Sequence, residues 1–149
     1  MIEAAGSGFL IAILWMDLIF DVQVLPHRRS AELPEPALAS IAAYYHRATT
    51  TSRPMSLLIA AVMAILLAAM TFDAFRGVTP VWSVGLSAVL AGAPILLALV
   101  RTVPHAVALG HRSGTLAEQS RLARSICRDH LLCLTSMSAF LVLVLSVGV

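Results

Sequence analysis

Two aspartates stand four residues apart in the otherwise apolar stretch LWMDLIFDVQVLPHRR, which runs from Leu14 to Arg29. At helical spacing, Asp17 and Asp21 share one face, with their Cβ atoms about 6 Å apart. Two ionised carboxylates at that separation repel each other in apolar surroundings, so we expect one to be protonated unless a cation lies between them. Such a pair can act as a general acid and base, or can bind a metal ion.

Other polar side chains can join this pair. The candidate polar centre, which would be catalytic in an enzyme, is Asp17, Asp21, Asp129 and His130. Its candidate charge partners are Arg101 and Arg128, and its candidate metal ligands are His46, His105, His130 and Asp21. The sequence has no His-x-x-x-His, Glu-x-x-His or clustered Cys/His pattern. A metal site would therefore need ligands from several helices.

The composition places these residues in a membrane. Of the 149 residues, 59% are hydrophobic and only 12% are charged, with a mean hydropathy of +0.89. Four apolar runs, which do not alternate as barrel strands would, each approach the roughly 20 residues that cross a bilayer. They predict transmembrane helices at about 6–25, 54–72, 80–100 and 126–149. We expect a single all-α membrane domain, an up-down bundle of four transmembrane helices over residues 1–149.

The arginines set the expected orientation. Nine of the ten lie in or beside two predicted loops, residues 26–53 and 101–125, and only Arg76 lies on the other side. The positive-inside rule makes both loops cytoplasmic and both termini external, which fits a bacterial cytoplasmic (inner) membrane. No DNA-binding motif or lysine-rich run is present, so we expect lipid and no nucleic acid as a partner.

Both loops are predicted to contain interfacial helix. After LPEP, the segment ALASIAAYYHRATTTS places Leu38, Ile41, Ala42 and Tyr45 at helical spacing, with Tyr44 and Tyr45 expected near the headgroups. TLAE at 115–118 matches a capping box, so a helix should begin there and continue into the fourth span.

That long helix has two sides. Leu116, Gln119, Ala123, Ile126 and His130 share one side. A basic stripe of Arg121, Arg124 and Arg128 faces elsewhere, toward anionic lipid headgroups.

Proline and small residues mark the third span. Gly85, Ala88, Ala91 and Gly92 permit close helix packing, and Pro94 predicts a kink with a freed carbonyl.

The first half of the chain resembles a known plan. A first helix, an inner loop with an interfacial helix, and SRPM opening the second helix resemble small four-helix bacterial membrane oxidoreductases, namely HemJ-type protoporphyrinogen oxidases and anthrone-oxygenase-like proteins. The resemblance is architectural and implies oxidation of a lipophilic substrate. HemJ-type proteins share a haem-binding histidine in their first membrane helix, and residues 6–25 contain none. No catalytic residue is carried over.

Three functions follow as hypotheses. The one we favour is an accessory or interaction subunit of a membrane complex, in which Asp17 and Asp21 fix helix packing through Arg101, Arg128 or a partner. The second is a membrane-embedded oxidoreductase that uses a metal ion or haem on a lipophilic substrate. The third is a small proton-coupled carrier, which at this size would work as a homo-oligomer. The sequence does not decide whether the chain is an enzyme.

Reporter fusions test the predicted topology. Fusions after Arg29 and Gly114 should report the cytoplasm, and fusions at Gly77 and the C-terminus should report the outside, because the arginines are distributed nine to one. Activity of a cytoplasmic reporter at the C-terminus would contradict this arrangement.

Overall fold

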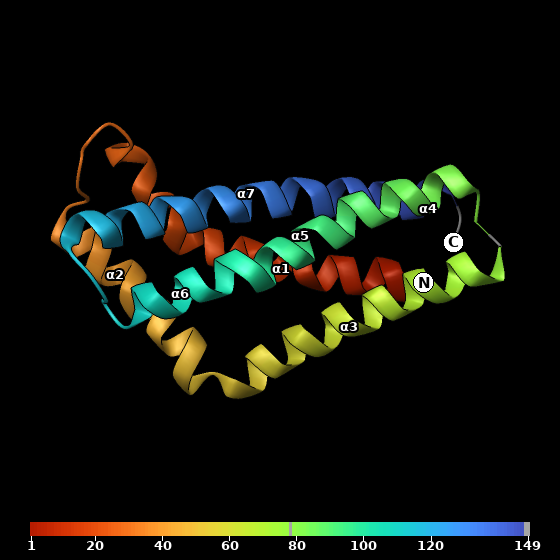
Figure 1. The fold of residues 1–149 in the computed structure, drawn as a ribbon, viewed down its shortest axis with the longest axis horizontal. Helices are drawn as coiled ribbons and strands as arrows, with labels where there is room; N and C mark the ends of the chain where they lie inside the picture. The colour runs from red at the N-terminus through yellow and green to blue at the C-terminus, as the bar shows by residue number, and fades with distance from the viewer. Residues whose placement is uncertain (78, 148–149) are drawn as a thin grey trace.

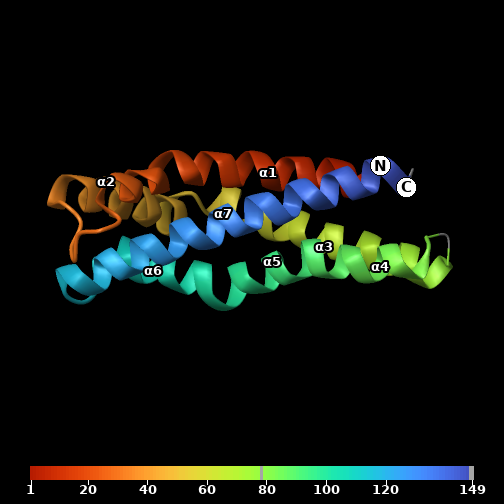
Figure 2. The same ribbon diagram turned by 90° about the horizontal axis from the view of Figure 1, so that it is seen from above.

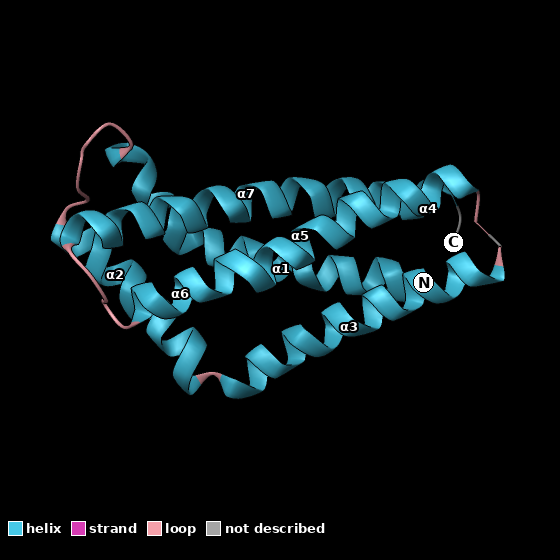
Figure 3. Ribbon diagram, in the orientation of Figure 1, coloured by secondary structure: helices cyan, strands magenta, loops and turns pink. Residues whose placement is uncertain are grey.

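The computed structural model describes residues 1–77 and 79–147, and within them the chain is helical and has no strand (Figure 3). In chain order the elements are α1 (Ile2–Asp21), a 3₁₀ turn (Val22–His27), α2 (Glu35–His46), a π turn (Arg47–Thr51), α3 (Arg53–Arg76), α4 (Val81–Ser87), a π turn (Ala88–Gly92), α5 (Ala93–Leu97), a π turn (Ala98–Thr102), α6 (Val103–Gly110) and α7 (Leu116–Val147).

Four helices in the described ranges are long and apolar enough to cross a membrane: Ile2–His27, Arg53–Arg76, Val81–Gly110 and Leu116–Val147. They run up and down in one elongated bundle (Figure 1). Both termini lie at one end, which we call the termini end, and α2 lies at the other, which we call the α2 end (Figures 1 and 2). The predicted all-helical class with four candidate spans is confirmed.

The third span is longer than the sequence suggested. We expected a helix to about residue 100 and then a loop, but α4, α5 and α6 form one continuous helix that ends at Gly110. A π turn precedes both Pro94 and Pro104, which puts each proline in the first turn of the next α segment. A missing N–H is tolerated there, so neither proline ends the helix. The predicted loop 101–125 is therefore mostly helical.

Helix α2 packs into the bundle rather than along its edge. Leu38, Ile41, Ala42 and Tyr45, the predicted face, are each at most 3% exposed, so this periodicity is confirmed. They form one core cluster with residues of α6 and α7, including Leu109. The ring of Tyr45 lies inside this cluster, and its expected depth near the headgroups stays a prediction.

The capping box at the start of α7 is confirmed. The backbone N–H of Glu118 donates to Thr115 Oγ1 at 3.2 Å, and the backbone N–H of Thr115 donates to Glu118 Oε2 at 2.7 Å. These bonds satisfy amides that have no partner within the helix. From there α7 runs for 32 residues, about 48 Å, and contacts α1, α2, α4, α5 and α6.

Helix α3 stands apart from the rest of the bundle. Only Leu66 of its 24 residues is buried. It packs along α1, meets α4 near the termini end, and is separated in Figure 1 from α5 and α6.

The contact between α2 and α6 depends on Gly110. A Cβ at this position would lie 2.8 Å from the backbone N of His46 and 3.0 Å from the backbone C of Tyr45. Since backbone atoms cannot yield as a flexible side chain can, Gly110→Ala should push α2 away and lower the free energy of unfolding by about 1–3 kcal/mol.

Gly85→Ala is the matched control, because a Cβ there meets nothing within 4 Å. Better helix propensity should leave that variant unchanged or stabilise it by up to about 1 kcal/mol. Unfolding in detergent, followed by circular dichroism, compares the two. Equal stability of both variants would contradict the close α2–α6 contact.

Candidate functional site

Asp21 lies at the centre of the polar side chains near the α2 end. Its side chain is fully buried, and both carboxylate oxygens have partners from other helices. Tyr45 of α2 donates its hydroxyl to Oδ1 at 2.6 Å, and Nδ1 of His130 on α7 lies 2.7 Å from Oδ2. The buried carboxylate thus joins three helices, in keeping with the rule that buried charges are paired and hydrogen-bonded.

Asp17 is held in the same way one helical turn earlier. Tyr44 donates its hydroxyl to Asp17 Oδ1 at 2.5 Å, and its ring stacks on Phe20 with centroids 4.1 Å apart. Two adjacent tyrosines of α2 therefore serve the two aspartates of α1, one each. Asp17 is the more open carboxylate, with 18% of its side chain exposed.

His130 is the residue that can supply a positive charge between the two aspartates. Its Nδ1 contacts Asp21, while its Nε2 lies 3.9 Å from Oδ2 of Asp17, too far for a hydrogen bond. A protonated imidazole here balances one of the two carboxylates. We call Asp17, Asp21 and His130, with Tyr44 and Tyr45 as donors, the polar centre.

The tyrosines keep their protons because of where they lie. Burial, together with the charge of the neighbouring carboxylates, raises the pKa of Tyr44 and of Tyr45 above the ordinary value of 10.0. Both phenols remain neutral donors, so they satisfy the carboxylate oxygens without cancelling their charge.

A cavity of about 440 Å³ opens beside the polar centre. Asp17, Tyr45 and His130 form a polar wall at one side, and Thr49, Ser56 and Thr102 add hydroxyl groups elsewhere in the lining. The other walls are mostly apolar side chains from α1, α3, α5, α6 and α7, among them Leu14, Ile59, Met63, Ile95, Leu99, Val103 and Met137. Largely apolar cavities with a few convergent polar groups are typical small-molecule sites.

Asp129 belongs to a different contact, although it is the neighbour of His130 in sequence. Its Oδ1 accepts from Arg101 at 2.9 Å, and Thr102 donates to Oδ2 at 3.4 Å. Arg101 also donates to Ser125 at 3.0 Å. Asp129 and Arg101 do not line the cavity, so this pair fixes the α4–α6 helix to α7 rather than joining the polar centre.

Arg128 does not have the role we predicted. It lies exposed on α7, and the two carboxylate oxygens of Asp21 are occupied by Tyr45 and His130 instead. Residues 128 and 130 are about 200° apart around a helix, so both cannot face α1. The side of α7 that includes His130 faces the core, and the arginine faces away.

The predicted basic stripe is divided in the structure. Arg124 donates to the backbone carbonyls of His27, Ser30 and Ala31, so it holds the first loop against α7. Arg121 lies 4.0 Å from Glu118 and is largely exposed. Only Arg121 and Arg128 therefore stay on the surface as candidates for lipid contact.

The candidate metal ligands are not gathered. In the part of the chain that the structure describes, no three His, Cys, Asp or Glu side chains come together to hold a metal ion. His46 contacts the ring of His111, with centroids 5.9 Å apart, and His105 lies outside the cavity lining. Of the four residues proposed, only Asp21 and His130 meet.

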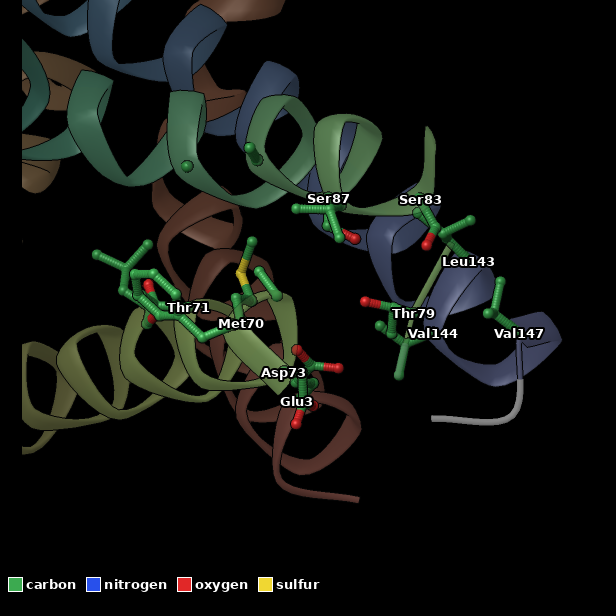
Figure 4. A pocket seen from close by; sticks show the side chains of 16 residues that line it. Glu3, Met70, Thr71, Asp73, Thr79, Ser83, Ser87, Leu143, Val144 and Val147 are labelled. Carbon is green, nitrogen blue, oxygen red and sulfur yellow. The ribbon is translucent and has the colours of Figure 1, made fainter. Parts of the chain in front are cut away.

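A second cavity, also of about 440 Å³, lies at the termini end. Figure 4 shows Glu3 of α1 and Asp73 of α3 beside each other there, with Ser83 and Thr79 across the cavity. Sequence reasoning did not single out this acidic pair. Acidic side chains alone do not define a ligand, and we place the candidate site at the polar centre, where an acid, a base and donors are connected.

Two functional residues were missed in the sequence, namely Tyr44 and Tyr45 as hydrogen-bond donors. A signal existed, because Tyr45 fell on the apolar face of the predicted α2 and a buried phenol needs a polar partner. Which carboxylate each hydroxyl reaches depends on the docking of α2, which the sequence does not contain.

Comparison of the chain with protein-family models, with curated proteins and with solved structures finds no match. The resemblance to HemJ-type and anthrone-oxygenase-like proteins therefore stays a prediction.

Titration of the tyrosines tests the polar centre directly, because Tyr44 and Tyr45 are the only two in the chain. The phenolate absorbance of the folded protein should appear well above pH 10.0, and that of the unfolded chain near its ordinary value. The free energy of unfolding should be insensitive to these groups below about pH 10 and fall above it, since only the unfolded chain then loses the protons. Phenolate formation near pH 10 in the folded protein would contradict the contacts.

Proposed function

We propose that the chain spans a lipid bilayer and binds a lipophilic small molecule beside the polar centre, with which it exchanges a proton. Four long apolar helices support the membrane placement. The arginines near the α2 end support a cytoplasmic position for that end, in a bacterial inner membrane with both termini outside.

The cavity is reachable from the side. Its α3 wall contains Ala60 and Met63, and its opposite wall contains Leu99 and Val103, which are 57% and 50% exposed. In a bilayer these apolar edges face lipid chains, which are as apolar as leucine. A lipophilic molecule can therefore enter from the membrane between α3 and the α4–α6 helix without crossing water.

The observation that carries the proposal is the arrangement of His130. Asp21 and Tyr45 hold Nδ1 and fix the orientation of the ring, while Nε2 remains on the cavity side with Asp17. Enzymes use this arrangement for acid–base catalysis: a carboxylate holds one imidazole nitrogen and orients the ring, and the second imidazole nitrogen faces the substrate. Histidine suits this role because its charge changes close to neutral pH.

Proton exchange is common to two of the three hypotheses, an enzyme for a lipophilic substrate and a proton-coupled carrier. The proposal uses the chain's own side chains, because the candidate metal ligands do not come together among the described residues. The accessory-subunit hypothesis stays a prediction, but its premise receives no specific support, because Asp17 and Asp21 find their partners inside the chain.

The first test blocks the cavity. In nanodiscs, Ala60→Trp should weaken binding of a naphthol by about tenfold or more, because an indole fills the space between the walls. Ala61→Trp is the matched control, since the neighbouring residue on α3 is exposed and does not line the cavity. Binding is read from naphthol fluorescence against nanodiscs without protein. Equal binding by both variants would contradict the cavity as the site.

The same titration reports proton exchange. The pKa of the naphthol hydroxyl should be about one unit lower in the unmodified protein than in protein-free nanodiscs, because an imidazolium stabilises the oxyanion. His130→Gln should bind the probe but remove this difference. An unchanged difference in that variant would contradict the role of His130.

A further inference from the structure

We infer that the head group of the ligand is a hydroxyl, which bridges Nε2 of His130 and Oδ2 of Asp17. This inference rests on the proposed function and names the chemical class of its ligand, a lipophilic phenol, hydroquinone or alcohol. Its basis is the 3.9 Å separation between those two atoms on the polar wall of the cavity.

The separation fits one oxygen atom. An oxygen at about 2.8 Å from both atoms, an ordinary hydrogen-bond length, would complete a triangle with an angle near 90° at that oxygen. The two groups are too far apart to bond each other and too close to admit two ligand atoms in line. In the absence of ligand, one water molecule can take this position, as is usual for polar groups separated by more than about 3.5 Å.

The charges of the polar centre decide which oxygen fits. With His130 protonated on both nitrogens, Nδ1 donates to Asp21 and Nε2 presents a second N–H to the cavity. Asp17 keeps an acceptor on the cavity side, because Tyr44 occupies its other oxygen. A neutral imidazole would instead leave the ionised carboxylates of Asp21 and Asp17 without a positive charge between them, which is costly in apolar surroundings. The gap therefore presents one donor and one acceptor.

A hydroxyl matches that pair and other common head groups do not. It accepts from His130 and donates to Asp17 with a single oxygen. A ketone or ether oxygen can only accept, so it would face Asp17 without a proton. A carboxylate has no proton to donate to Asp17, and an ammonium would point a cation at the imidazolium.

The lining and volume of the cavity indicate the chemistry of the rest of the ligand. Apart from the polar centre, it is lined mainly by Leu10, Ile13, Leu14, Met63, Ile95 and Met137. Its volume of about 440 Å³ holds a ring system or a folded chain rather than a single small alcohol. Proton transfer from the hydroxyl breaks its O–H bond, forms one on Asp17, and leaves an oxyanion beside the imidazolium.

The experiment compares head groups on one body in the unmodified protein. A naphthol, its methyl ether and the naphthylmethylamine are titrated into nanodiscs, and each affinity is corrected for partition into protein-free nanodiscs. The naphthol should bind about tenfold more tightly than the ether, the value expected for one hydrogen bond to a charged group. Tighter binding of the amine would overturn the inference, because it would require a neutral His130.

Asp17→Asn supplies the second measurement. Tyr44 still needs an acceptor and would take the amide oxygen, so the amide N–H₂ would face the gap and the hydroxyl would meet two donors. The preference for the naphthol over the ether should then disappear while the ether still binds. Asp73→Asn, which removes a carboxylate at the termini end, is the control and should keep the full preference.

The outcomes separate this inference from the proposed function. If Ala60→Trp blocks all three probes but the unmodified protein binds naphthol and ether equally, the cavity is the site and the hydroxyl inference is wrong. If Ala60→Trp leaves the binding of all three probes unchanged, or if no probe binds, the proposed function itself is wrong. A preference for naphthol that survives Asp17→Asn would assign the hydroxyl to another contact and overturn the bridge.

Discussion

Two carboxylates on one face of an apolar helix need partners inside the chain, and much of the α2 end is arranged to supply them. Helix α2 brings the two tyrosine hydroxyls, and α7 brings His130. The position of α2 depends in turn on Gly110, which lets the backbones of α2 and α6 meet, and on Arg124, which holds the loop before α2. The first half of α7 packs in the same core cluster as α2.

Neighbouring ionisable residues of α7 face different sides of the helix and make different contacts. His130 faces α1, Asp129 is turned about 100° toward the α4–α6 helix, and Arg128 is turned a further 100° to the surface. Three consecutive residues thus belong to the polar centre, to an ion pair and to the exposed surface. The ion pair is the structural contact that the sequence suggested for the aspartates of α1, but it is made by Asp129 and Arg101.

Sequence reasoning could find the spans and three members of the polar centre, Asp17, Asp21 and His130, because apolar runs, a capping box and helical spacing are local signals. The same spacing already set His130 on one side of α7 with Ala123 and Ile126, and both of those residues are buried. It could not choose the partner of Asp21, because Arg101, Arg128 and His130 all lie at similar depth and the choice depends on how far each helix is turned. The continuation of the third span past Pro104 was missed for a related reason, since a π turn leaves no mark in residue type.

The use of tyrosine in the centre and arginine outside it is itself informative. An arginine beside Asp21 would satisfy the carboxylate and also cancel its charge, as Arg101 does for Asp129. A phenol satisfies an oxygen and leaves the charge in place, so the carboxylates keep their full attraction for the imidazolium. Burial holds both phenols in the neutral form by raising their pKa. The polar centre is therefore hydrogen-bonded on most sides, while Asp17 and one side of His130 line the cavity, which is the arrangement on which the proposed proton exchange rests.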